Sequence, residues 1–281
     1  MPFVFKKRKV KKMFNKAKNE TLRFDEKEID YITFGRGSKV LVMIPGVGDG
    51  LKTVKGLAKP FAFMYRKYAK DFKVYVFSRK RDLQIGYTTK EMADDIATSL
   101  NLLGITKADV VGVSQGGMIV QHLAINHPDK IDKLVLAITS SRPNDLLVES
   151  VDTWVKQLKN EDFKSMMIDN AKRSYLGKKQ KRMVKLYKRI SFVVKPKSYE
   201  RFIAQALSCK EHNAYDKLNE ITNNTLIIGA EFDGILGCEP SYEIHNKISN
   251  SKIHIFKNES HGVFETKEFD EVILEFLNNS N

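Results

Sequence analysis

The sequence contains little cysteine and no long apolar run. Its 281 residues include two cysteines, Cys209 and Cys238, which lie far apart and form no C-x-x-C pattern. Two such cysteines do not make a disulfide framework, so we expect a reducing compartment and predict a cytoplasmic protein. A transmembrane helix needs about 18 or more consecutive apolar residues, and no such run occurs. Lysines also occupy the place of a signal peptide's apolar core, so no signal peptide is expected.

Acidic residues are fewer than basic residues, but only in two places. The chain has 48 Lys and Arg against 34 Asp and Glu, a formal net charge of +14. Residues 1–20 hold eight basic residues and one acid, a charge of +7, and residues 172–201 hold twelve and one, a charge of +11. The rest of the chain is therefore slightly acidic, and the high pI describes two segments rather than the whole fold.

The basic segments have several interpretations. The run Lys178-Lys179-Gln180-Lys181-Arg182 is typical of a solvated helix face, or of a surface attracted to anionic membranes or acidic substrates. Nucleic-acid binding is disfavoured, because no recognition motif occurs and aromatic residues are not interleaved with the cations as stacking requires. Residues 1–20 fit either a disordered segment or a short amphipathic helix that touches a membrane.

Apolar runs and helical periodicities alternate along the rest of the chain. This alternation predicts an α/β fold with a mostly parallel sheet, in which strands buried on both faces read as continuous apolar runs. We expect strands at 29–34, 40–44, 73–78, 108–113, 134–138, 224–228 and 252–256, and helices at 61–70, 90–103, 116–126, 240–248 and 267–278.

The alternation breaks between residues 142 and 216. This region shows only helix-like stretches rich in Lys and Met, so we interpret it as a helical cap inserted into a core of residues 21–141 and 217–281. A cap at the carboxyl ends of the strands would cover the place where open α/β sheets bind ligands. The apolar residues expected on its inner side are Leu146, Leu147, Val151, Trp154, Leu158, Phe163, Met166, Met167, Leu176, Met183, Leu186, Phe192 and Phe202.

The segment Gly112-Val113-Ser114-Gln115-Gly116 is a G-x-S-x-G motif. It follows a predicted strand and opens a predicted helix, and this context distinguishes it from a chance match in a glycine loop. A nucleophilic serine needs such a tight turn so that its hydroxyl projects above the sheet, and the glycines remove side chains that would clash. We therefore predict that Ser114 is a catalytic nucleophile.

A serine nucleophile needs a base and an acid that orients the base. After a G-x-S-x-G serine the acid precedes the histidine in the chain. Among His212, His245, His254 and His261, only His261 lies in a loop directly after a predicted strand. Asp233 follows the strand TLIIGA and is favoured as the acid over its neighbour Glu231, because it lies further into the loop and precedes Gly234.

The developing oxyanion needs two backbone N–H donors. One is expected from Gln115, the residue after the nucleophile, and the other from the loop Pro45-Gly46-Val47-Gly48 after an earlier strand. Val47 is the best candidate in that loop. The proposed chemistry requires neither a metal ion nor an organic cofactor.

These motifs together resemble the α/β-hydrolase superfamily. The stretch GYTTKEMADDIATSLNLLGITKADVVGVSQGGMIVQHLAINHPDKIDKLVLAIT is similar to the elbow region of esterase-like and cofactor-free lactonase-like members. The resemblance covers roughly residues 29–141 and 220–278. It implies an eight-stranded, mostly parallel sheet with helices on both faces and a helical cap. It also supports Ser114, Asp233 and His261 as a triad, with Val47 and Gln115 as oxyanion donors. Many members have His-Gly where this chain has Pro45-Gly46, so the hydrogen bonds of that histidine are absent.

The resemblance implies a serine hydrolase that cleaves a carboxylic ester of a small-molecule substrate through an acyl-enzyme. A thioesterase, an aminopeptidase or an acyltransferase would use the same residues, and a non-catalytic binding protein would use the same scaffold. The sequence leaves the acyl group, the alcohol group and the oligomeric state open.

Overall fold

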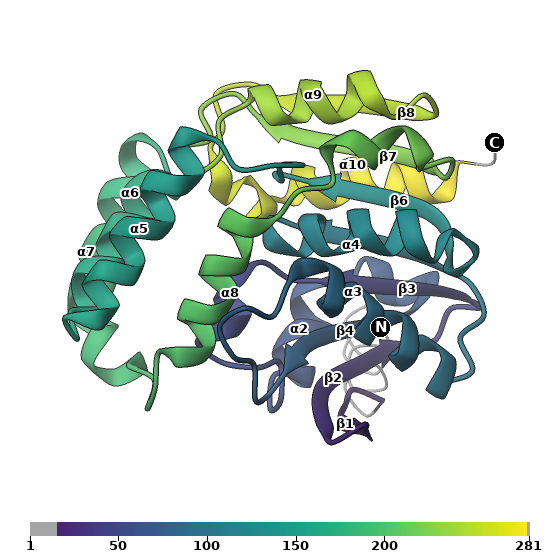
Figure 1. Ribbon diagram of the computed structural model, residues 1–281, viewed down its shortest axis with the longest axis horizontal. Helices are drawn as coiled ribbons and strands as arrows, with labels where there is room; N and C mark the ends of the chain where they lie inside the picture. Colours follow the sequence, from purple (N-terminus) through teal and green to yellow (C-terminus); the bar gives the residue numbers. More distant parts are fainter. Residues whose placement is uncertain (1–15, 280–281) are drawn as a thin grey trace, which may run out of the picture.

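An eight-stranded sheet forms the centre of the protein in the computed structural model, which describes residues 16–279 (Figure 1). The strand order is β1-β2-β4-β3-β5-β6-β7-β8. The β1–β2 and β2–β4 pairs are antiparallel and the other pairs are parallel. The strands are β1 Lys18–Phe24, β2 Lys27–Gly35, β3 Lys39–Ile44, β4 Phe72–Lys80, β5 Ala108–Val113, β6 Ile131–Ala137, β7 Asn224–Ala230 and β8 Ser251–Phe256.

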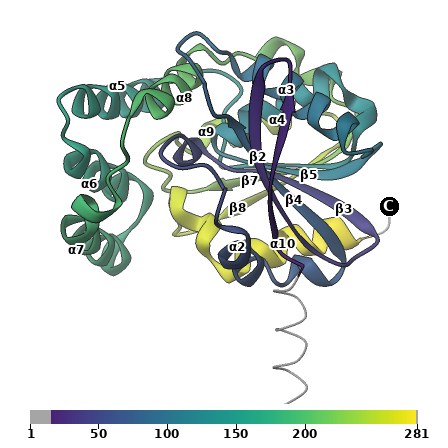
Figure 2. The same ribbon diagram turned by 90° about the horizontal axis from the view of Figure 1, so that it is seen from below.

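Helices cover both faces of the sheet, as Figure 2 shows. Successive side chains of a strand point to opposite faces, and in β3 Val42 and Ile44 join one core cluster while Leu41 and Met43 join the other. The first cluster packs under α3 Thr89–Leu102, α4 Gln115–Asn126 and α9 Glu239–Lys247, and the second under α2 Ala58–Met64 and α10 Lys267–Asn278. Short 3-10 turns are η1 Val47–Gly50, η2 Tyr68–Lys70, η3 Pro128–Lys130, η4 Tyr215–Glu220 and η5 His261–Glu265. The predicted α/β-hydrolase fold class is confirmed.

Residues at both ends of α3 explain where this helix begins and ends. The Thr88 side chain accepts a hydrogen bond from the backbone N–H of Glu91, and the Glu91 carboxylate accepts one from the backbone N–H of Thr88. This capping box satisfies two of the free N–H groups at the helix start. Gly104 then adopts a φ of 66°, which favours glycine and ends the helix.

One sequence prediction needs correction in this part of the chain. The helix expected at 61–70 is instead α2, which begins at Ala58 and ends at Met64, followed by η2. Pro60 lies in the first turn of α2, where its missing N–H costs no intrahelical hydrogen bond. The basic segment expected at 1–20 overlaps β1, which starts at Lys18, and its residues 1–15 lie outside the described residues.

Four helices lie between β6 and β7 and form the cap over the carboxyl ends of the strands. They are α5 Asp145–Lys159, α6 Phe163–Ser174, α7 Gly177–Val194 and α8 Glu200–Glu211. Figure 1 shows α5, α6 and α7 together at one end of the molecule, with α8 between them and the sheet. The core that α5, α6 and α8 share includes Leu147, Val151, Trp154, Leu158, Phe163, Met166 and Phe202, all buried as expected.

Four residues expected on the inner side of the cap lie on its surface instead. The exposed fraction is 39% for Leu146 and Leu176, 41% for Leu186 and 79% for Phe192.

Within residues 16–279, every helix is too short or too polar to cross a membrane.

Candidate active site

Ser114 occupies a sharp turn between β5 and α4. Its backbone adopts φ 55° and ψ −121°, a left-handed conformation that costs energy for a residue with a side chain. The flanking glycines make the turn feasible. A Cβ on Gly116 would lie 1.9 Å from the carbonyl oxygen of Ile44, and one on Gly112 would lie 2.4 Å from a methyl group of Val120. The sequence predicted this strand–turn–helix, and the structure contains it.

The structure brings Ser114, His261 and Asp233 together. The distance from His261 Nε2 to Ser114 Oγ is 3.1 Å, and from His261 Nδ1 to Asp233 Oδ2 it is 2.7 Å. The second carboxylate oxygen of Asp233 accepts hydrogen bonds from the backbone N–H groups of Ile235 and Leu236, at 2.9 and 3.0 Å. His261 and Asp233 are both buried. The carboxylate is therefore held by the loop after β7 and aimed at the imidazole.

The rival side chains are engaged elsewhere. The Glu231 carboxylate accepts a hydrogen bond from the Asn258 backbone N–H at 2.9 Å, within the loops after β7 and β8. His254 packs edge-on against Phe256 in β8, and His245 contacts Ser251 Oγ at 2.8 Å. His212 contacts Thr89 Oγ1 at 2.9 Å.

Each of the two candidate oxyanion donors is the backbone N–H of the first residue of a helical turn. Gln115 is the first residue of α4 and Val47 the first residue of η1, so neither N–H has an acceptor within its own helical turn. The two turns lie close together, because a Cβ built on Gly46 would lie 3.2 Å from Ser114 Cβ and 3.7 Å from its Oγ. Both N–H groups thus belong to turns that flank the serine.

Residues 39–268 match the family model described as alpha/beta hydrolase fold. The chain belongs to the α/β-hydrolase family. A protein of Caulobacter vibrioides named "Putative carbamate hydrolase RutD" is 26% identical to this hydrolase over 203 residues, which cover 70% of this chain and 75% of that protein. The protein of the same name from Caulobacter segnis is 38% identical over 79 residues, which cover 28% of this chain and only 30% of that protein.

Solved structures show the same fold. The enol-lactonase from Burkholderia xenovorans LB400 has a TM-score of 0.79 and 17% sequence identity, and the match covers 92% of this chain and 100% of that one. At this identity the likeness concerns the fold alone.

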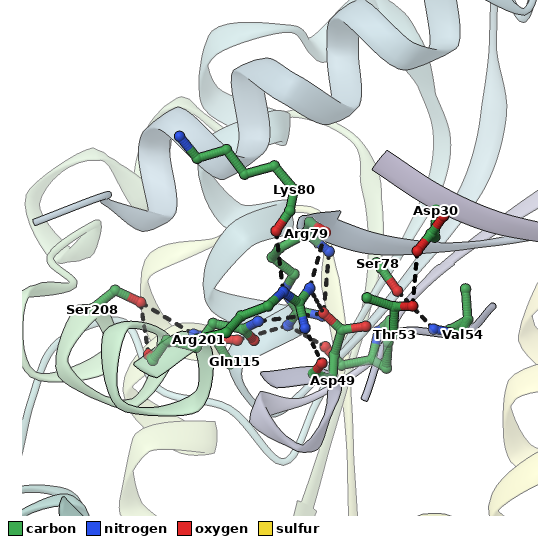
Figure 3. A network of polar contacts seen from close by, with 12 residues as sticks. Asp30, Asp49, Thr53, Val54, Ser78, Arg79, Lys80, Gln115, Arg201 and Ser208 are labelled. Carbon is green, nitrogen blue, oxygen red and sulfur yellow. Dashed lines mark hydrogen bonds and ion pairs between the residues drawn. The ribbon is translucent and has the colours of Figure 1, made fainter. Parts of the chain in front are cut away.

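A buried polar network that the sequence did not predict supports the loop that carries Val47 (Figure 3). Arg79, at the end of β4, donates from Nη2 to the Pro45 carbonyl oxygen and to Gln115 Oε1, the latter at 2.8 Å. Asp49 lies beside it, with Oδ2 3.8 Å from Arg79 Nη1 and 3.2 Å from the Arg79 backbone nitrogen. Arg79 thus contacts both segments that carry the candidate oxyanion donors.

The cap completes this network. Arg201 of α8 donates from Nη2 to Asp49 Oδ2 at 2.6 Å and to the Arg79 carbonyl oxygen at 2.9 Å. Gln115 Nε2 donates to the Gln205 carbonyl oxygen at 2.7 Å. Burial lowers the pKa of Arg79 to about 10, an effect that the carboxylate of Asp49 opposes. The one sequence signal was a cation two positions after the apolar run VYVF, with Ser78 between them.

A cavity of about 920 Å³ opens beside Ser114 and His261. Much of its wall is apolar, and part of its lining comes from α2, α6, α7 and α10. The apolar lining residues that also belong to or pack on the core of the cap are Val47, Met118, Leu147, Val151, Trp154, Ile235 and Leu236. Within residues 16–279, no group of three or more His, Cys, Asp or Glu side chains is placed to hold a metal ion.

Proposed function

We propose that this hydrolase is a serine esterase that cleaves a carboxylic ester through an acyl-enzyme, with Ser114 as nucleophile, His261 as base and Asp233 as the orienting acid. The observation that carries the proposal is the continuous chain of contacts from the Ser114 hydroxyl through His261 to Asp233, at 3.1 and 2.7 Å. Such a chain lets the hydroxyl lose its proton to a correctly oriented imidazole.

The proposed reaction has two halves. Ser114 Oγ attacks the ester carbonyl carbon while His261 Nε2 takes the hydroxyl proton, and the N–H groups of Val47 and Gln115 bind the oxyanion. The carbon–oxygen bond to the alcohol then breaks, and His261 gives its proton to the leaving alcohol. Water attacks the acyl-serine in the second half, with its proton passing to His261 and then to Ser114 Oγ as the carboxylic acid leaves.

The cavity favours a substrate with an apolar acyl group. Much of the cavity lining consists of aliphatic, aromatic and thioether groups, which bind an acyl chain by removing apolar surface from water. The name of the Caulobacter relatives suggests a carbamate as a second candidate. A carbamate carbonyl would be attacked in the same way, but a small polar carbamate would leave most of a 920 Å³ cavity unfilled.

A fluorophosphonate probe tests the mechanism, because it labels serines that an adjacent base activates. We expect labelling of the wild type, no labelling of Ser114→Ala and strongly reduced labelling of His261→Gln. His254→Gln is the matched control, since His254 lies in β8 and packs on Phe256, and it should label like the wild type. Labelling that persists in Ser114→Ala would contradict the assignment of the nucleophile.

Substrate class is tested by turnover of p-nitrophenyl esters of increasing acyl length, with a small carbamate in parallel. We expect kcat/KM to rise with acyl length until the cavity is filled. Faster turnover of the carbamate would favour the second candidate. Tight retention of an ester without turnover would indicate a binding protein, and turnover of thioesters or peptides alone would indicate one of the other acyl-transfer activities.

A further inference from the structure

One face of α7 carries a dense row of cations. Positions three and four residues apart fall on the same side of a helix, and the exposed residues of α7 follow this spacing. The helix has no acidic residue. The outer face, as we define it, consists of Lys178, Lys181, Arg182, Lys185, Leu186, Lys188, Arg189, Phe192 and Val193.

The charges of the outer face are not neutralised within the protein. Between residues 16 and 279, no carboxylate lies within ion-pair distance of its six cations. Lys179, which lies outside the outer face, does find a partner, at 3.4 Å from Glu265. Six unpaired cations at three- and four-residue spacing repel one another and produce a strong positive potential. The folded chain therefore offers this face to an external anionic partner.

Apolar side chains lie on the same face. Leu186 is 41% exposed, Phe192 79% and Val193 70%, so three large apolar groups meet solvent among the cations. A nucleic-acid backbone would contact the charges but would leave the aliphatic side chains of Leu186 and Val193 in water. An anionic bilayer binds both kinds of side chain, because cations contact the lipid headgroups while apolar side chains enter the boundary with the acyl chains.

The position of α7 connects this face with the active site. Figures 1 and 2 show α7 at the outer edge of the cap, away from the sheet. Tyr187, on the inner side of α7, lines the same cavity as Ser114, and so does Met64 of α2, which is 57% exposed. A surface that contacts the outer face would thus lie against a helix that forms part of the cavity wall.

We propose that the outer face of α7 docks the hydrolase onto an anionic lipid surface. The cations supply long-range attraction, and Leu186, Phe192 and Val193 insert at the interface. This inference concerns where the enzyme works and does not depend on which ester it cleaves. It selects one of the interpretations that the sequence left open for residues 178–182.

Vesicle flotation with the full chain tests the proposal. We expect tight binding to vesicles of phosphatidylcholine mixed with phosphatidylglycerol and weak binding to phosphatidylcholine alone. Lys181→Glu/Arg182→Glu/Lys185→Glu should weaken binding to the anionic vesicles by about 100-fold or more, since each interfacial cation contributes about 1 kcal/mol. Phe192→Ser/Val193→Ser keeps every charge and should weaken binding by about tenfold.

The matched control reverses three exposed lysines of the hydrolase body, Lys107→Glu/Lys217→Glu/Lys252→Glu, and changes the net charge by the same amount. It should bind the anionic vesicles within about twofold of the wild type, because only charges near the surface contribute. The proposal is overturned by equal loss in the control, by unchanged binding in either α7 variant, or by wild-type binding to duplex DNA but not to vesicles. A cooperative thermal unfolding transition of each variant would verify that the variant is folded.

Discussion

Two regions of this hydrolase are rich in arginine or lysine. The cations of one region are buried among polar partners, whereas those of the other are exposed and have no carboxylate partner among the described residues. Under the loop that carries Val47, Arg79 and Arg201 are surrounded by Asp49, carbonyl oxygens and the Gln115 amide. On α7, six cations face solvent without a carboxylate partner among the described residues. The difference follows from solvation, because water stabilises an exposed cation whereas a buried one needs partners within the protein.

The comparison indicates separate roles for the two regions. A buried ion pair fixes geometry, since removing one member leaves the other without solvent or partner. The network therefore suits the positioning of a loop beside Ser114, because Arg79 holds the Pro45 carbonyl oxygen of that loop. A face of exposed cations without carboxylate partners contributes little to stability and is free to bind an external anionic partner.

Replacing Arg79 breaks the buried region and should have the largest effect. Arg79→Met leaves Asp49 with fewer partners and leaves the Pro45 carbonyl and Gln115 Oε1 without their donor. We expect the free energy of unfolding to fall by about 3–5 kcal/mol, measured by urea denaturation. We also expect slower fluorophosphonate labelling of the folded fraction. The loop at Pro45 and the start of α4 at Gln115, which carry the candidate oxyanion donors, would both lose their hydrogen bond to Arg79.

The control for this prediction is Arg142→Met. Arg142 pairs with Glu243 at 2.9 Å on the surface, so its loss should change stability little. Equal urea midpoints for the wild type and Arg79→Met would show that the network does not hold the loop.

Asp109 is a buried carboxylate like Asp49, but it has no arginine partner among the described residues. Burial raises its pKa to about 6, with the nearby Asp132 adding to the effect. Because the folded state holds this proton more tightly than the unfolded state, stability falls as the pH rises from about 4 to about 6. Asp109→Asn should therefore raise the free energy of unfolding at pH 7 by about 2 kcal/mol, after allowance for solvent screening, and change it little at pH 4.

Urea denaturation of the wild type and Asp109→Asn across this pH range measures the effect. The amide oxygen of the substituted side chain can still accept from the Lys133 backbone N–H, as Asp109 does at 3.2 Å, so the charge alone changes. A stability difference that does not vary between pH 4 and pH 7 would contradict the role of the buried charge.

Neutralising the exposed region should have the smallest effect on stability. Lys181→Gln/Arg182→Gln/Lys185→Gln removes three charges from α7, and Gln has nearly the same helix propensity as Lys and Arg. We expect the free energy of unfolding to stay within about 0.5 kcal/mol of the wild type, with a slight gain from reduced repulsion. A large loss in urea denaturation would mean that these cations hold the cap together.

The sequence predicted the parts of the site that depend on local pattern. Ser114 was identifiable because a strand, two glycines and a helix start must be adjacent in the chain to make its turn. The strand β1 was missed, because it is an edge strand whose charged and polar residues show no apolar run. Leu186 and Phe192 were assigned to the inner side of the cap, because periodicity does not say which side of a helix has a neighbour.

By itself, the sequence determined the alternation of strands and helices from β2 onward, the fold class and the turn that carries Ser114, because the patterns that reveal them lie in residues close together in the chain. Only the tertiary structure decided that Asp49, Arg79 and Arg201 meet beneath the loop that carries Val47 and that the outer face of α7 remains uncovered. Pairing between distant side chains and exposure of a helix face both depend on how whole elements pack, and local composition does not encode that packing.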